Sequence, residues 1–199
     1  MNTKFLKLTL LALVLFTASC SNDDNETVVA ETETVSNLEA PSTASGYTKF
    51  SFSKNAVVTT DDWDIAFRGT TILVNGGVKG SDATEPARTG QGAVSIVSDI
   101  FANVTTVPAN ETFKQDTATL YAIPTGGGNG WYTYNVVGLH IIAPIAGKVF
   151  VVKTHDGKYA KFEVLSYYKD APAEPNYMTS VAGYYKFNFA YQANSNTTF

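Results

Sequence analysis

The most regular alternation of apolar and polar residues lies in the second half of the chain, on either side of an Asp-Gly pair. Residues 149–154 (VFVVKT) place mostly apolar side chains on both faces of an extended strand, and the alternation resumes over residues 159–166. Strand-forming runs on both sides of Asp156-Gly157 are typical of a β-hairpin, because this dipeptide suits a tight turn. We therefore expect a long antiparallel hairpin here, with the other strands built around it.

Shorter alternating or apolar runs predict the remaining strands, and the residues between them are typical of turns. These runs lie within residues 47–54, 63–75 and 184–191, while residues 93–100 predict either a strand or one short helix. No stretch from residue 46 onward keeps an amphipathic helical period over three turns. The sequence predicts one all-β domain, either sandwich-like or an irregular twisted antiparallel sheet with long hairpins.

The stretch around Trp63 combines large apolar residues with two carboxylates. Trp63 and Phe67 are expected to anchor the core. Asp62 and Asp64 could form a metal or acid–base pair, but no third ligand lies at a useful spacing, so hydrogen bonding within turns is the favoured interpretation. Residues 80–92, with three glycines and a proline, form a long polar loop of the kind that is usually mobile or binds a ligand.

The first 19 residues have the pattern of a lipoprotein signal peptide. Lys4 and Lys7 precede an apolar run, residues 8–16, that is too short to cross a membrane as a helix, and small residues then lead to Cys20. Cys20, the only cysteine of the chain, is therefore the expected site of lipid attachment. An ordinary secretory peptide with an accidental cysteine near its cleavage site is the alternative.

The residues that follow the signal peptide are acidic and rich in Ser and Thr. Residues 20–45 contain no aromatic side chain, and we expect them to form a flexible tether that leads to an all-β domain over residues 46–199. Residues 21–24 (SNDD) resemble the acidic surface-export signals of lipoproteins in some Gram-negative bacteria, although a solvated linker has the same composition. The expected location is the outer surface of the outer membrane, with the lipid on Cys20 as the anchor.

Charge and cysteine content exclude several functions. Without Lys4 and Lys7, 12 of the 14 basic side chains remain against 18 acidic ones, a net charge of −6, so nucleic acid is not an expected partner. No cysteine remains for a disulfide, a thiolate metal site or a thiol nucleophile. The chain has neither G-x-S-x-G nor H-E-x-x-H and only two histidines, so we predict no catalytic residue, no dedicated metal site and no enzymatic activity.

Four blocks of the sequence together indicate a family: WDIAFRGTTILVNGG (residues 63–77), GWYTYN (residues 130–135), GKVFVVKTHDGKYAKFEVLSYY (residues 147–168) and the closing YYKFNFAYQ (residues 184–192). With these blocks the chain resembles the HmuY family of haem-binding lipoproteins. The resemblance covers nearly all of residues 46–192. It implies an all-β fold and capture of haem or another tetrapyrrole outside the cell, as in a haemophore for iron acquisition. It also implies delivery to a TonB-dependent outer-membrane receptor, by a carrier that performs no reaction.

The family's iron ligands do not carry over to this sequence. The resemblance implies two axial histidines, one ahead of the Gly-Trp pair and one five residues after its Trp. The second position is Val136 here, and the short segment before Trp131 contains no histidine. Some relatives use methionine instead, and Met178 is the only methionine after the signal peptide.

Four other residues are therefore the candidate haem-binding residues. His140 is either a satisfied histidine of an apolar strand or an iron ligand, and His155 is either an exposed turn residue or a ligand. If the strand of His140 paired with the strand that follows it, a four-residue offset would place the two histidine rings on one sheet face and a five-residue offset would place them on opposite faces. Met178 is either a core filler or a soft axial ligand, and Tyr134 either packs or stacks on a porphyrin. The alternative function is a surface binding or adhesion lipoprotein that keeps the fold but takes another ligand.

Overall fold

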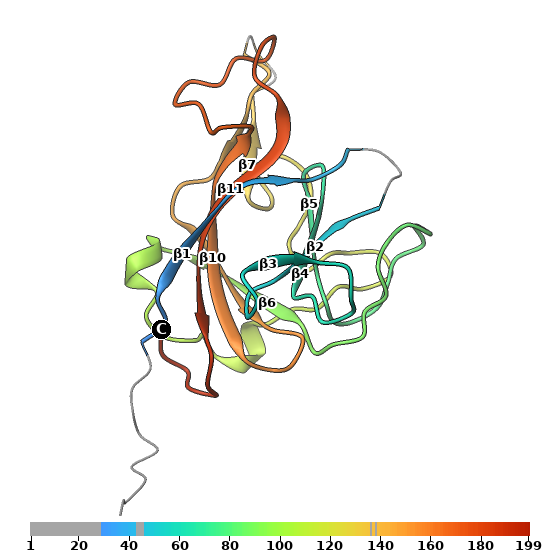
Figure 1. The fold of residues 1–199 in the computed structure, drawn as a ribbon, viewed down its shortest axis with the longest axis vertical. Coiled ribbons are helices and arrows are strands. Elements are labelled where there is room, and N and C mark those ends of the chain that lie inside the picture. Colours follow the sequence, from blue (N-terminus) through green and yellow to red (C-terminus); the bar gives the residue numbers. More distant parts are fainter. Residues whose placement is uncertain (1–28, 43–45, 136, 138) are drawn as a thin grey trace, which may run out of the picture.

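The computed structural model describes residues 29–42, 46–135, 137 and 139–199 and shows an almost entirely β protein with two main antiparallel sheets (Figure 1). The larger sheet has the strand order β1-β11-β10-β9-β6, with β1 (Thr32–Glu39), β6 (Ala93–Ser98), β9 (Lys148–Lys153), β10 (Tyr159–Tyr168) and β11 (Ala182–Gln192). The smaller sheet has the order β3-β2-β4-β5, with β2 (Thr48–Ser51), β3 (Ala56–Val58), β4 (Ile65–Arg68) and β5 (Thr71–Val74).

A separate ribbon and two short turns complete the fold. Strands β7 (Tyr132–Tyr134) and β8 (Ile142–Pro144) pair only with each other among the described strands, and η1 (Phe101–Asn103) and η2 (Asn110–Thr112) are single 3-10 turns. The all-β prediction is confirmed, and of the two alternatives for residues 93–100 the strand is the one that forms.

The inner faces of the two sheets meet in an aromatic core. Alternation along β11 buries Tyr185, Phe187 and Phe189 on one face. The Phe187 ring lies 5.4 Å from the ring of Phe50 in β2 and 5.7 Å from that of Phe67 in β4. Edge-to-face and offset ring pairs at such distances add to the free energy gained by burying their area. Trp63 and Phe67 are both 0% exposed, as predicted for core anchors.

The central hairpin forms where the alternation predicts it. β9 and β10 pair antiparallel with Lys153 opposite Tyr159, and Gly157 in the turn has a φ of +88°, which favours glycine. The turn of this hairpin also contacts the loop that leads into β6, because the backbone N–H of Gln91 donates to the carbonyl of His155.

The predicted tether is wrong for Thr32–Glu39. This segment is β1, which pairs antiparallel along β11 and shields what would otherwise be an unpaired strand edge (Figure 1). Most of its side chains are exposed, and for this reason its composition resembles that of a linker. Leu38, however, is only 5% exposed. Backbone pairing and a few apolar side chains are enough to order it. Residues 1–28, which include Cys20 and the predicted signal peptide, lie outside the described residues.

The long polar loop over residues 80–92 is fixed by buried charges. The guanidinium of Arg88 lies 3.0 Å from the carboxylate of Glu85 and 2.9 Å from that of Asp116, and these three side chains are at most 1% exposed. The hydroxyl of Tyr121 donates to the other oxygen of Glu85. The loop is therefore attached to the body of the protein by an ion cluster.

Candidate functional site

The β7–β8 ribbon and the loop between β10 and β11 form one end of the molecule, which we call the tip: the described residues 132–135, 137, 139–144 and 169–181 (Figure 1, top). Trp131 is 1% exposed and fixes the base of the ribbon, since its indole N–H donates to the carbonyl of Thr70 at 2.8 Å. The backbone N–H of Ile142 donates to the hydroxyl of Tyr168 at 3.0 Å and ties β8 to the end of β10.

Three side chains converge at the tip around His140. The Tyr134 hydroxyl lies 3.0 Å from Nδ1 of His140, and the ring of Tyr177 makes an edge contact with the imidazole at 5.7 Å between centroids. His140 has a φ of +50°, in the left-handed region that only a small share of non-glycine residues adopt. Residues held in such conformations often belong to functional sites.

His140 does not lie in an apolar strand, so that interpretation is wrong. β8 begins at Ile142 and pairs with β7, with Ile142 opposite Tyr134, and not with β9. His140 is exposed on the connecting segment instead. Apolar alternation alone would predict an extended strand through His140. The left-handed backbone at this residue interrupts that extended conformation.

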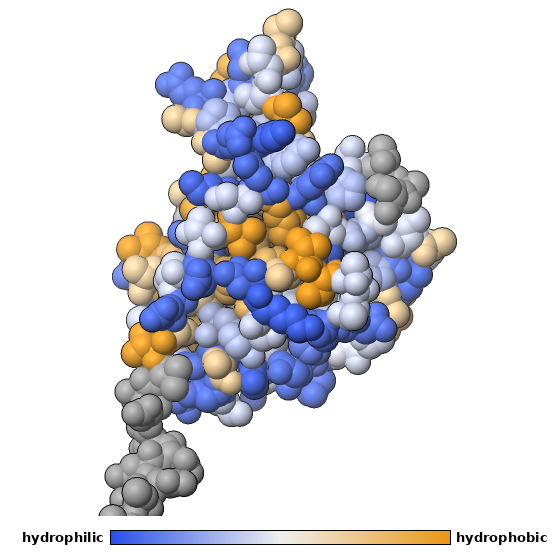
Figure 2. Space-filling model, viewed as in Figure 1, coloured by the Kyte–Doolittle hydropathy of each residue, from blue (hydrophilic) through white to orange (hydrophobic). Residues whose placement is uncertain are grey.

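The tip also exposes an unusual number of large apolar side chains. The exposed fraction of Met178 is 77%, which rules out its role as a core filler. In Figure 2, apolar side chains stand among hydrophilic ones at this end of the molecule. The exposed large apolar residues of the tip are Val137, Leu139, Tyr177, Met178 and Val181.

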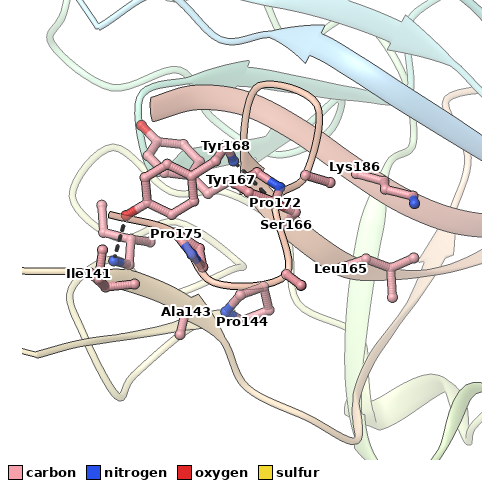
Figure 3. Close-up of a pocket in the computed structure, with 13 residues that line it drawn as sticks. Ile141, Ala143, Pro144, Leu165, Ser166, Tyr167, Tyr168, Pro172, Pro175 and Lys186 are labelled. Carbon is pink, nitrogen blue, oxygen red and sulfur yellow. Dashed lines mark hydrogen bonds between the residues drawn. The ribbon is translucent and has the colours of Figure 1, made fainter. Parts of the chain in front are cut away.

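Two grooves meet along the ribbon. One has a volume of about 590 Å³ and lies between the segment leading into β8 and the proline-rich loop. The other, of about 330 Å³, continues between β8, the end of β10 and that loop (Figure 3). Ile141, Ala143 and Pro175 line both grooves, and Leu165 and Lys186 lie at the far end of the smaller one.

His155 lies far from this site and has a structural role. Its Nδ1 is 2.8 Å from Oδ1 of Asp64, and its backbone N–H donates to the same oxygen at 3.0 Å. Asp64 is 1% exposed and also accepts from the backbone N–H of Phe52 at 2.7 Å. Burial raises the pKa of Asp64, although these hydrogen bonds lower it. The side chain of His155 is 23% exposed, so it is not the freely exposed turn residue that its position predicts.

The two histidines cannot share one iron. His155 precedes the start of β10 at Tyr159, whereas the segment of His140 is tied to the end of β10 at Tyr168. A ten-residue strand spans roughly 30 Å at about 3.3 Å per residue. Both rings would have to lie within a few ångströms of a common metal.

The acidic residues near Trp63 do not form a metal site. Asp64 serves as the hydrogen-bond acceptor described above, and Asp62 accepts from the side chains of Lys54 and Thr60. Among the residues that the structure describes, no group of three or more His, Cys, Asp or Glu could hold a metal ion. Asp62 bonds locally, to Thr60 two residues before it, as the favoured interpretation of hydrogen bonding within turns predicts. The interpretation is wrong for Asp64, whose partners Phe52 and His155 lie 12 and 91 positions away.

A third groove, of about 450 Å³, lies between the outer strands of the two sheets, β1 and β3. In Figure 2 an apolar area shows in the middle of the face, between these strands. The described residues that line this groove include neither histidine nor methionine. It therefore offers no axial ligand and is not the favoured site.

Of the four candidate residues, the structure brings Tyr134 and His140 together at the tip and places Met178 next to Tyr177, while His155 lies elsewhere. Tyr177 was not a candidate, and the only sequence signal for it is an aromatic residue beside Met178 in a proline-rich loop. Val136, the position where the family would have its second histidine, lies outside the described residues.

Comparison with known proteins supplies a family and a fold. The family described as "HmuY protein" matches residues 43–189. A crystal structure described as that of a lipoprotein from Bacteroides fragilis has a TM-score of 0.53 and 17% identity, and the match covers 82% of this chain and 92% of that one.

Two further solved structures are similar. An apo HmuY analog from Tannerella forsythia has a TM-score of 0.53 and 17% identity, with 83% of this chain and 97% of that chain covered. An HmuY-like haem-binding protein from Bacteroides vulgatus has a TM-score of 0.48 and 17% identity, with 80% and 91% covered. At this identity the first two support the fold alone. No curated protein matches the sequence.

Proposed function

The chain belongs to the HmuY family, and from that premise we propose that it binds haem, or a closely related tetrapyrrole, at the tip and acts as a carrier without enzymatic activity. The observation that supports this most is the Tyr134–His140–Tyr177 cluster beside a groove with both apolar and polar lining residues. A haem site usually has a side chain that can bind the iron, aromatic or aliphatic walls, and a polar group that hydrogen-bonds to the iron-binding side chain. The tip offers all of these.

His140 has the hydrogen bonding of a preoriented axial ligand. With Nδ1 engaged by the Tyr134 hydroxyl, Nε2 is left as the coordinating nitrogen. Iron-bound histidines usually donate their other N–H to an oxygen, which fixes the tautomer and ring orientation. In this arrangement Nδ1–H donates to the Tyr134 oxygen. Tyr134 is thus a positioning residue, and the haem iron supplies the coordination chemistry when it is bound.

The remaining wall combines apolar and aromatic side chains with polar groups, among them Asn135 and Glu174 of the larger groove. Tyr177 already makes an edge contact with His140, and Leu139 and Ile141 line the larger groove. Met178 carries a thioether on the residue next to Tyr177 and would be a second candidate to hold the iron. Flat aromatic and aliphatic surfaces of this kind bury the faces of a porphyrin.

The cellular role extends the same proposal. A lipid on Cys20 would anchor the protein to the outer membrane, and the residues before β1 would carry the domain above the cell surface. Haem captured there would pass to an outer-membrane receptor of the TonB-dependent class.

Titration of the purified protein with haemin tests the proposal. The wild-type protein should shift the Soret band of haemin, and so should His155→Gln, because His155 lies away from the tip. His140→Ala should lose the shift or give a different ligand-field spectrum. An unchanged spectrum in the wild type, or the same complex in His140→Ala, would reject the assignment.

A surface module that binds another ligand is the second candidate. It is favoured by Val136 at the position where the family's second histidine is expected. Failure of haemin to bind while the protein remains folded would support this candidate over the first.

A further inference from the structure

The two main sheets leave an open edge between β1 and β3. Among the described strands, β1 pairs only with β11 and β3 only with β2, so each has one edge without a neighbouring strand. Such an edge presents backbone N–H and C=O groups that can pair with an added strand. The groove of about 450 Å³ lies between these two edges. At one end of it the Thr48 hydroxyl donates to the carbonyl of Glu39 at 2.6 Å and joins the sheets.

Buried rings of the core lie at the bottom of this open edge. A second groove, of about 220 Å³, continues the first along β1, and Asn55 lines both; we call the two together the edge groove. Val57 stands at its rim with an exposed fraction of 56%, and Figure 2 shows apolar surface in this part of the face. The core rings that line the edge groove, each at most 2% exposed, are those of Phe50, Phe52 and Phe189.

The charges of the edge groove are all of one sign. Its charged lining residues are Glu31, Glu33 and Glu39, which are exposed, and none of the described lining residues is Lys, Arg or His. No ion pair in the part of the chain that the structure describes joins these glutamates to a basic side chain. Uncompensated carboxylates attract a cationic partner and repel an anionic one. Residues 21–28 of this chain do not fit, because they contain three acidic side chains and no basic one.

The register of β1 fixes what should lie opposite each of its side chains. Glu33 pairs with Phe189 and Val35 with Phe187, and both rings belong to the core. Because side chains alternate along a strand, Glu31, Glu33 and Val35 share the inner face of β1, and the threonines between them lie on its outer face.

We propose that the edge groove binds an extended segment of a partner protein, which adds to β1 as a further strand. Its basic side chains lie opposite Glu31 and Glu33, and an apolar side chain lies opposite Val35. Backbone pairing supplies affinity in such complexes, and the side-chain contacts supply specificity. The stems of the basic side chains cover the rings of Phe52 and Phe189 while their charged ends reach the glutamates. The site does not involve the tip, so the inference stands apart from haem binding.

The probe for this site is a synthetic peptide with blocked ends, Thr-Val-Thr-Val-Thr-Lys-Thr-Lys, which matches an antiparallel strand; its reversed sequence matches a parallel one. Threonine suits the outer face, because it favours strands and can pair with the threonines of β1. In two-dimensional NMR spectra of the labelled protein, one of the two peptides should shift the amide signals of β1 and β3 and leave those of the tip in place. Lack of saturable binding by both peptides, or shifts centred outside the edge groove, would overturn the proposal.

Modified peptides separate strand addition from simple charge attraction. Replacement of both lysines by glutamate should abolish binding, because the edge groove is acidic. In a paired strand only every second N–H points to the neighbouring strand. N-methylation of one alternate set of amides should therefore abolish binding, and methylation of the other set should leave it intact. Binding of the glutamate peptide, or equal effects of the two methylations, would count against the proposal.

Charge-reversal variants of the protein locate the contact. Glu33→Lys should weaken the lysine peptide several-fold and strengthen the glutamate peptide. Glu31→Lys repeats the test outside β1, and melting temperatures show that each variant is folded. Glu111→Lys makes the same change at an exposed residue of η2 and should bind as the wild type does. Equal weakening at all three positions would mean that the peptide responds only to net charge, and the proposal would fall.

Discussion

Replacing Arg88 by Met should destabilise the protein strongly. The side chains of Arg88, Glu85 and Asp116 are 0–1% exposed, so the substitution leaves two carboxylates buried without their cation. Breaking a buried ion pair from one side typically costs about 3–5 kcal/mol. For a chain of this size, a loss of that order lowers the melting temperature by roughly 6–20 °C.

The matched control is Arg68→Met. Arg68 makes a similar contact, 2.6 Å from the carboxylate of Asp82, but these side chains are 21% and 37% exposed. Partly exposed pairs contribute about 0–1 kcal/mol because water screens them. Both substitutions keep a long apolar side chain and remove one guanidinium. The difference between their losses of unfolding free energy therefore measures the effect of burying the ion pair.

The loss of unfolding free energy in Arg88→Met should depend on pH in a definite direction. Burial raises the pKa of Asp116, and the nearby Arg88 is one of the groups that lower it. Without Arg88 the pKa of Asp116 rises further, so the variant loses stability as the pH increases through that higher pKa. The deficit should be largest at neutral pH and shrink in acid, where Asp116 becomes protonated.

Urea unfolding followed by tryptophan fluorescence measures the losses of unfolding free energy at each pH, and thermal unfolding measures the change in melting temperature. Trp63 and Trp131 are 0% and 1% exposed, so unfolding changes the environment of both rings. Equal losses of unfolding free energy in Arg88→Met and Arg68→Met would refute the reasoning. So would an Arg88→Met deficit that grows as the pH is lowered.

Three other outcomes follow from the described contacts. Leu38→Ala should lower the unfolding free energy measured in urea by about 2–5 kcal/mol. Val29→Ala changes a side chain that is 71% exposed and should have little effect. Equal effects would contradict the conclusion that β1 is packed on the body of the protein. Asp64→Ala should cost about 1–3 kcal/mol for each of the two backbone amides that it leaves without an acceptor, and Asp62→Ala much less, as measured by thermal unfolding. Tyr134→Phe should weaken haemin binding by about 10–100-fold in a Soret titration while the melting temperature stays unchanged; full affinity would exclude Tyr134 as a positioning residue.

The sequence predicts the sheets better than it predicts the site. The alternation of β9, β10 and β11 and the Asp156-Gly157 turn are local signals, and all of them form as expected. β1 was missed because its side chains are mostly exposed, so the backbone pairing with β11 that orders Thr32–Glu39 leaves little trace in composition.

The site could be predicted only as a set of residue types. His140 is flanked by apolar residues, and alternation alone cannot reveal a φ of +50° or the pairing of β8 with β7. The contact between His140 and Tyr177 joins segments 37 positions apart, so it depends on how the proline-rich loop packs beside the ribbon. The Asp64–His155 pair depends equally on tertiary structure, since it joins the two sheets.

The central claim is that haem binds at the tip, and paramagnetic broadening tests its location most directly. Ferric haemin should broaden the backbone amide signals of the described residues in 132–144 and 169–181 first in two-dimensional NMR spectra of the labelled protein. The signals of Asp64 and His155 should stay sharp, because His155 lies roughly 30 Å away along β10 and Asp64 is hydrogen-bonded to it. Broadening centred on the groove between β1 and β3, or on His155, with the tip unaffected would contradict the account.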